Sequence, residues 1–117
     1  MSGTRIFKGS GKGRQDIQRS TADTDNVVTL AAPTDALLSN TLSVIHVGMS
    51  ATPDAGTDII VTTGAAEIYR MPIVDAGITY IPFFDSWLIG AVGATIVITV
   101  EAAGTGVTSD IWYTEGR

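Results

Sequence analysis

The sequence predicts an all-β domain, an antiparallel two-sheet sandwich of seven to eight strands behind an extended N-terminal arm. Threonine (16), isoleucine (13) and valine (10) supply a third of the 117 residues, and these β-branched side chains favour pleated, half-buried surfaces. Short apolar runs recur about every ten residues and are separated by Gly, Pro and Asp turns, as in a sandwich. The length fits one domain, and no helical period extends beyond a single turn.

The clearest strand has alternating residues, with Ala94, Ile96, Ile98, Val100 and Ala102 on one side. Such alternation indicates a strand that is buried on one face. The strand also follows the densest apolar stretch of the chain, so we expect it to lie at the centre of the core.

Seven strands are expected in total, and turn residues separate them. They cover residues 27–31, 42–49, 58–63, 66–74, 78–84, 94–102 and 107–114. Pro72 and Pro82 mark sheet edges or strand ends, because proline cannot donate to a ladder. We expect strands 78–84 and 94–102 to form a hairpin-like pair across the apolar loop 85–93. The residues expected to face the core include Ile96, Ile98, Val100, Ile111 and Tyr113.

The N-terminal residues 1–26 are expected to form an extended basic arm, and residues 27–117 the sandwich domain. Residues 1–19 carry a net charge of +4 and the rest of the chain −9. The arm has too few apolar residues to offset its ordering entropy alone, so we expect it to lie along another protein chain; the alternative is an arm folded back on its own domain. The residues expected to bind the partner are Arg5, Ile6, Phe7, Lys8, Lys12, Arg14, Ile17 and Arg19.

Composition limits the classes of function. The chain has no cysteine, so disulfides, thiolate metal sites and thiol nucleophiles are excluded. No apolar run reaches the length of a membrane span, and the first residues lack the apolar segment of a secretion signal. A nucleic-acid binder would be expected to carry a basic face on the folded domain, so binding to nucleic acid or membrane is not expected.

No residue pattern indicates catalysis. The glycine-rich segment 9–14 lacks the preceding strand, the following helix and the Ser or Thr after Lys12 that a phosphate-binding loop needs. His46 is the only histidine, and no activated serine motif accompanies it. We therefore expect His46 to be buried or partner-facing, and we expect no enzymatic activity, no cofactor and no metal.

Two ligand-binding alternatives remain open. Asp54 and Asp58 with the backbone between them could hold calcium, although the spacing of an EF-hand loop is absent. The aromatic residues could instead form a sugar-stacking face, although packing in the core or an interface is their commoner use. These aromatic residues are Tyr80, Phe83, Phe84, Trp87 and Trp112. A carbohydrate-binding or adhesin-like module is therefore the alternative function.

The sequence resembles the small β-sandwich cement or decoration proteins of tailed-bacteriophage heads. The residues that carry the resemblance are the arm 1–26, the Thr-, Val-, Ala- and Gly-rich strands, and the segments 82–93, 95–102, 104–106 and 110–113. The resemblance implies a jelly roll and a non-enzymatic virion protein that stabilises the head by binding between capsomers. It further implies a homotrimer on the capsid surface, bound to the major capsid protein or another virion protein and made in the bacterial cytoplasm. Small tail or fibre-attachment sandwiches resemble the sequence nearly as well.

Overall fold

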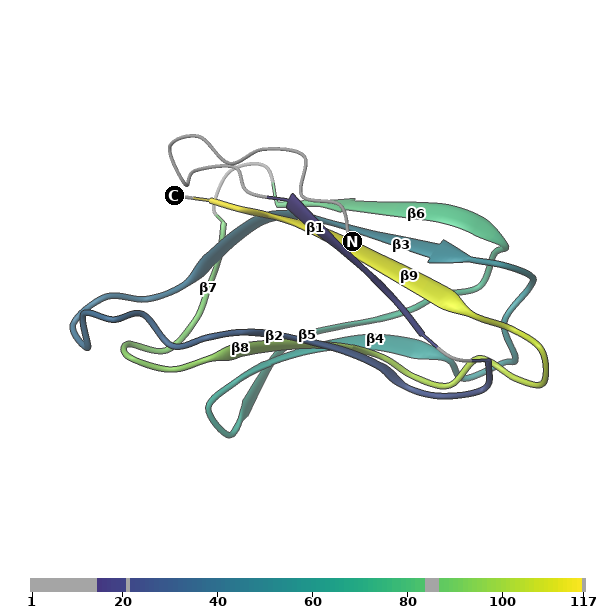
Figure 1. Cartoon of the computed structure of the whole chain (residues 1–117), viewed down its shortest axis with the longest axis horizontal. Helices are drawn as coiled ribbons and strands as arrows, with labels where there is room; N and C mark the ends of the chain where they lie inside the picture. Colours follow the sequence, from purple (N-terminus) through teal and green to yellow (C-terminus); the bar gives the residue numbers. More distant parts are fainter. Residues whose placement is uncertain (1–14, 21, 84–86, 117) are drawn as a thin grey trace.

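The structure is a computed structural model that describes residues 15–20, 22–83 and 87–116, and it is built from strands and turns (Figure 1). The nine strands are β1 (Gln15–Arg19), β2 (Asn26–Leu30), β3 (Thr41–Met49), β4 (Asp58–Thr63), β5 (Ala66–Pro72), β6 (Gly77–Pro82), β7 (Leu88–Ile89), β8 (Ile96–Val100) and β9 (Ser109–Glu115). In the part of the chain that is described, no helix is long and apolar enough to cross a membrane.

The strands form two antiparallel sheets that face each other, which confirms the predicted sandwich (Figure 1). Sheet A has the order β1-β9-β3-β6, and the two-residue β7 pairs with the start of β3. Sheet B has the order β2-β8-β4-β5. Pro82 ends β6 and Pro72 ends β5, and both strands are sheet edges, as predicted for strands that contain proline.

The strand pairing is that of a jelly roll. With β7 set aside, the first strand pairs with the last (β1 with β9), the second with the second last (β2 with β8), then β3 with β6 and β4 with β5. The ladders β3·β9 and β4·β8 join these pairs into two sheets. A long two-stranded ribbon wound on itself has this topology, so the predicted jelly-roll-like architecture is confirmed.

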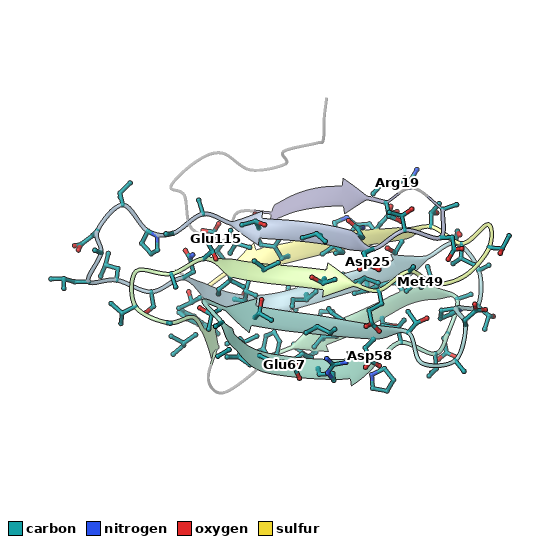
Figure 2. All side chains as sticks on the ribbon, turned by 90° about the horizontal axis from the view of Figure 1, so that it is seen from below. Arg19, Asp25, Met49, Asp58, Glu67 and Glu115 are labelled. Carbon is teal, nitrogen blue, oxygen red and sulfur yellow. The ribbon has the colours of Figure 1, made fainter. Side chains whose placement is uncertain are left out.

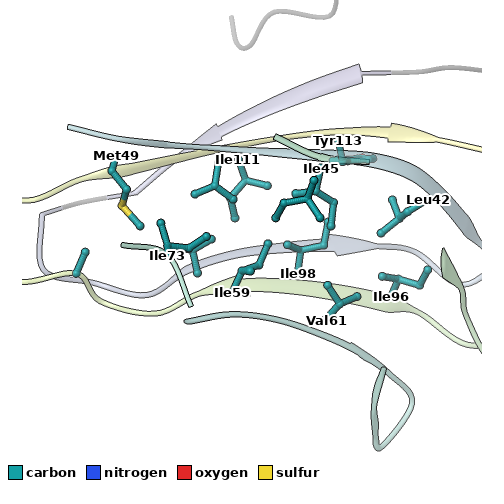
Figure 3. Packing of buried hydrophobic residues seen from close by; sticks show 14 of the residues in the cluster. Leu42, Ile45, Met49, Ile59, Val61, Ile73, Ile96, Ile98, Ile111 and Tyr113 are labelled. Carbon is teal, nitrogen blue, oxygen red and sulfur yellow. The ribbon is translucent and has the colours of Figure 1, made fainter. Parts of the chain in front are cut away.

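The core fills the space between the sheets, with side chains from both (Figure 3). Every second residue of β8 and β9 faces inward, because successive side chains of a strand alternate between faces. All five residues predicted to face the core are buried: Ile96, Ile98, Val100, Ile111 and Tyr113.

The predicted hairpin-like pair is wrong. The strand β6 pairs with β3 in sheet A, whereas β8 lies between β2 and β4 in sheet B. The chain therefore crosses from one sheet to the other between these two strands. In the jelly roll, β6 pairs with β3. It therefore does not form the hairpin with β8 that closeness in the sequence favours.

The first strand lies inside the segment 1–26 that was assigned to the arm. Residues Gln15–Arg19 pair with β9 along its full length, from Gln15 opposite Thr114 to Arg19 opposite Asp110. The strand extends sheet A by one edge strand. The sheet thus begins at Gln15, and the arm that precedes it is reduced to residues 1–14, which lie outside the described residues.

Candidate functional site

Exposed apolar side chains gather at one end of the sandwich. Leu37 (82% exposed) and Leu38 (57%) lie in the loop between β2 and β3, and Ile89 (58%) and Val92 (64%) lie at β7 and the loop after it. Both loops lie at the left end of the molecule in Figure 1. We call these four residues the apolar tip. Clustered exposed apolar side chains of this kind mark interaction sites in soluble proteins.

Hydrogen bonds hold the two loops of the apolar tip together. The backbone N–H of Gly93 donates to the carbonyl of Leu38 at 2.8 Å, and that of Gly90 to the carbonyl of Asn40 at 2.9 Å. The side-chain amide of Asn40 donates to the carbonyl of Ala31 at 2.9 Å. A surface that is already ordered loses little conformational entropy when a partner binds.

A left-handed glycine allows the loops to approach this closely. Gly93 has φ of +70°, and a Cβ there would lie 2.9 Å from the carbonyl oxygen of Ala36. Only glycine occupies such a position without strain. The loop after β7 can therefore lie directly against the loop before β3.

The first strand begins at the same end of the sandwich as the apolar tip. Gln15 begins β1 opposite Thr114, while Leu42, next to the loop before β3, lies opposite Glu115. Residues 1–14 contain four basic residues and no acidic residue. The described chain therefore begins, directly after this basic segment of the sequence, at the end of the sandwich that carries the apolar tip.

The other end of the sandwich is acidic. Asp23, Asp25, Asp54 and Asp75 are exposed on its loops. The backbone N–H groups of Asp23 and Asp54 donate to the carbonyls of Val107 and Ala103, and the carboxylate of Asp25 accepts from the backbone N–H of Ala102. Figure 2 shows Asp25 and Met49 toward this end and Glu115 toward the other. The loops at this end therefore carry four exposed aspartates, whereas the two loops of the apolar tip carry one, Asp35.

The outer face of sheet A carries a row of aromatic rings. His46 on β3 lies in register between Tyr80 on β6 and Trp112 on β9. The ring centroids of His46 and Tyr80 are 4.9 Å apart, and those of His46 and Trp112 are 6.3 Å apart in an edge-to-face arrangement. We call these three residues the aromatic row. Tyr80 is exposed and His46 and Trp112 are half-buried.

A β-bulge decides which face His46 occupies. The register of β3 shifts between Leu42 and Val44, so Leu42 points into the core while Val44 and His46 point outward. Strict alternation along this strand would place Leu42, Val44 and His46 on one side, but the bulge turns Leu42 to the opposite face. His46 itself is half-buried against two aromatic rings.

The other predicted aromatic residues are separated from this row. Phe83 packs against Tyr69 at the margin of the core, with ring centroids 5.4 Å apart. Trp87 lies beside Gly116 and Thr41. Phe84 lies outside the described residues. Of the four proposed sugar-stacking residues that the structure describes, Tyr80 and Trp112 share the outer face of sheet A beside His46.

The two acidic residues considered for calcium, Asp54 and Asp58, contact other parts of the chain. The carboxylate of Asp58 accepts a hydrogen bond from Arg70 at 2.7 Å, and the side chain of Glu101 accepts one from the backbone N–H of Asp58 at 2.9 Å. Asp54 lies instead against Gly104. Among the described residues no three His, Cys, Asp or Glu side chains are grouped to hold a metal ion.

The shifted pKa values that the structure supports belong to surface ion pairs. A hydrogen bond with Arg70 lowers the pKa of Glu67, and hydrogen bonds with Glu67 and Asp58 raise that of Arg70. A hydrogen bond with Asp110 raises the pKa of Arg19. A general acid needs a carboxyl pKa that is raised, so the shift of Glu67 is in the opposite direction.

The residues predicted to bind a partner fall into two groups. Ile17 and Arg19 belong to β1, whose backbone pairs within its own domain. The others lie outside the described residues, as does the glycine-rich segment 9–14; they are Arg5, Ile6, Phe7, Lys8, Lys12 and Arg14. The apolar tip was not predicted, although two consecutive leucines two residues after the Pro33-Thr34-Asp35 turn were a signal for it.

No protein-family model and no curated protein matches this sequence.

Proposed function

We propose that this chain is a non-enzymatic structural protein of a virus particle, a decoration or cement protein that stabilises a tailed-bacteriophage head by binding between capsomers. The observation that carries the proposal is the apolar tip. Four exposed apolar side chains lie at the end of the domain where β1 begins. A basic arm that precedes β1 would add electrostatic contacts to the apolar ones at this end. The partner is the major capsid protein or another virion protein.

The apolar tip at one end and the exposed aspartates at the other suggest how the bound protein is oriented. The apolar tip gains by leaving water, at roughly 25 cal/mol for each Å² that a partner covers. The exposed aspartates of the opposite end would lose hydration in an interface. We therefore orient the apolar tip and the arm toward the capsid, and the acidic end toward the surrounding solution.

Binding to purified particles tests this proposal. The double variant Leu37→Ser/Leu38→Ser should bind capsids at least about tenfold more weakly than wild type, because it removes central apolar contacts. The matched control is Val74→Ser, an equally exposed apolar residue (65%) on a loop at the acidic end, and it should bind as wild type does. Equal binding by the double variant and wild type, with both folded, would refute attachment through the apolar tip.

A carbohydrate-binding module is the second candidate function. The aromatic row favours it, because the exposed ring of Tyr80 and the half-buried rings of His46 and Trp112 offer apolar surfaces with polar tips on one sheet face. A glycan array separates the two functions, since a protein that only attaches to capsids gives no signal on it.

A further inference from the structure

A pocket of about 240 Å³ opens on sheet A at the end opposite the apolar tip. It lies where β1 and β3 end and where β6 and β9 begin. Its lining includes Arg19, Gly48, Ser50, Ile78, Thr108, Asp110 and Trp112. The pocket therefore combines apolar, charged and hydroxyl groups from four strands and the loops beside them.

Apolar side chains form one part of the lining. Ile78 is 68% exposed, and the indole of Trp112 lies over Gly48 on the neighbouring strand. A Cβ on Gly48 would be 3.1 Å from Cζ3 of Trp112, so the missing side chain is what allows the ring to rest against the backbone. Ile78 and the ring of Trp112, which ends the aromatic row, thus present an apolar surface to the pocket.

Polar groups at fixed positions form the other part. Arg19 donates from Nε to Oδ1 of Asp110 at 2.7 Å and from Nη2 to Oδ2 at 2.8 Å, which fixes both side chains in one plane. A guanidinium has five N–H donors and a carboxylate has about four acceptor sites. The two hydrogen bonds of this pair therefore leave further donors of Arg19 and acceptor sites of Asp110 for a ligand. The hydroxyl of Ser50 accepts from the backbone N–H of Thr108 at 2.9 Å and can donate its own hydrogen.

We propose that this pocket binds one pyranose ring of a neutral carbohydrate. A pyranose has apolar C–H faces that fit Trp112 and Ile78, and a rim of hydroxyls that both donate and accept, as the groups of Arg19, Asp110 and Ser50 require. The charges of Arg19 and Asp110 cancel, which favours a neutral ligand over an ion. The volume is below the roughly 300–1,000 Å³ of pockets for drug-sized ligands, so it suits a single ring.

This site rests on the second candidate function and is independent of attachment through the apolar tip. Because the pocket lies at the opposite end, both surfaces can be occupied in one molecule. On a capsid to which the apolar tip is bound, the pocket would face the solution and could hold a glycan of a cell surface.

The test is an NMR titration of the full chain with methyl glycosides of glucose, galactose, mannose and N-acetylglucosamine, each to about 50 mM, because one ring gives about millimolar affinity. The indole N–H of Trp112 reports on the pocket, and that of Trp87 is the internal control. We expect a saturating shift of Trp112 with at least one glycoside and no shift of Trp87.

Two variants in the pocket and one outside it make the test specific. Asp110→Asn should weaken binding about tenfold by removing a charged acceptor, and Ile78→Ser should weaken it without disturbing the fold, because the side chain is exposed. Asp58→Asn breaks the comparable ion pair with Arg70 on sheet B and should leave binding unchanged. No saturating shift with any glycoside would overturn the proposal. A glycan-array signal that persists in both pocket variants would keep the second candidate function and reject this site.

Discussion

Ile98 shows most directly how a single residue supports the fold. It is fully buried on β8 between β2 and β4. Truncation to alanine leaves a cavity in close-packed surroundings, so Ile98→Ala should lower the free energy of unfolding by about 2–5 kcal/mol. Urea denaturation measures this, and Val97→Ala on the outer face of the same strand is the control, with an expected loss well below that of Ile98→Ala. A change of less than about 0.5 kcal/mol for Ile98→Ala would contradict its place in the core.

Glu67 gives a prediction for pH. Its pKa is lowered from the ordinary value of 4.5 by the hydrogen bond with Arg70, so the folded state holds the carboxylate more firmly than the unfolded state does. Its contribution to stability is fully present above pH 4.5 and disappears as pH falls through the lower folded pKa. Melting curves of wild type and Glu67→Gln should therefore differ slightly at pH 7 and converge in strong acid. A difference that grows as pH falls would contradict this sign.

The sequence predicted correctly which side chains face the core where inward and outward residues alternate regularly. Ile96, Ile98 and Val100 alternate with outward residues, and the structure buries all three. Leu42 was misplaced because the bulge between Leu42 and Val44 adds one residue to β3. A bulge depends on the partner strand β9, so the sequence of β3 alone contains no signal for it.

Among the elements, β1 gives the sharpest prediction. If residues 1–19 only bound a partner, their removal would leave the sandwich nearly as stable; in this structure it would remove an edge strand and the ion pair between Arg19 and Asp110. Removal of residues 1–14 should leave the melting temperature unchanged. Removal of residues 1–19 should lower it by about 5–15 °C, which corresponds to a few kcal/mol for a domain of this size. Calorimetry of the two truncated chains provides the comparison, and equal melting temperatures would show that β1 adds no stability.

The pairing of the elements could be predicted only in part. The edge positions of β5 and β6 followed from Pro72 and Pro82, because proline lacks the N–H that a central strand needs. The partner of β1 could not be found in this way, because β9 follows it by about ninety residues. The sequence of β1, Gln-Asp-Ile-Gln-Arg, is also mostly polar, and its place in the sheet comes from the ladder that β9 offers.

At the scale of the whole molecule, the candidate surfaces arise from the topology. The apolar tip forms because the winding of the ribbon brings the loop before β3 beside the loop after β7, which are about fifty residues apart in the chain. The aromatic row likewise requires the order β9-β3-β6. Composition indicated that apolar residues were available for contacts, but only the arrangement of the strands shows where they gather.

Self-association is the last prediction. The homotrimer that the resemblance implies needs an uncharged patch on an outer face, and sheet B has one over β2, β8 and the middle of β4, beside the ion pairs of Arg70 with Asp58 and Glu67. Val27 and Ile60 flank Thr99 in register across β2, β8 and β4, and Val97 lies on the same face. A charge buried at the centre of an interface is strongly unfavourable.

Wild type should therefore sediment at three times the 12.2 kDa of one chain, and Thr99→Glu should sediment as a monomer with an unchanged fold. Tyr80→Glu on the outer face of sheet A is the matched control and should remain a trimer, because the proposed contact does not involve that sheet. Sedimentation velocity at tens of micromolar, about 10⁻⁵ M, distinguishes these species. A monomeric wild type would reject self-association in solution, whereas a trimer that survives Thr99→Glu would place the contact on another face.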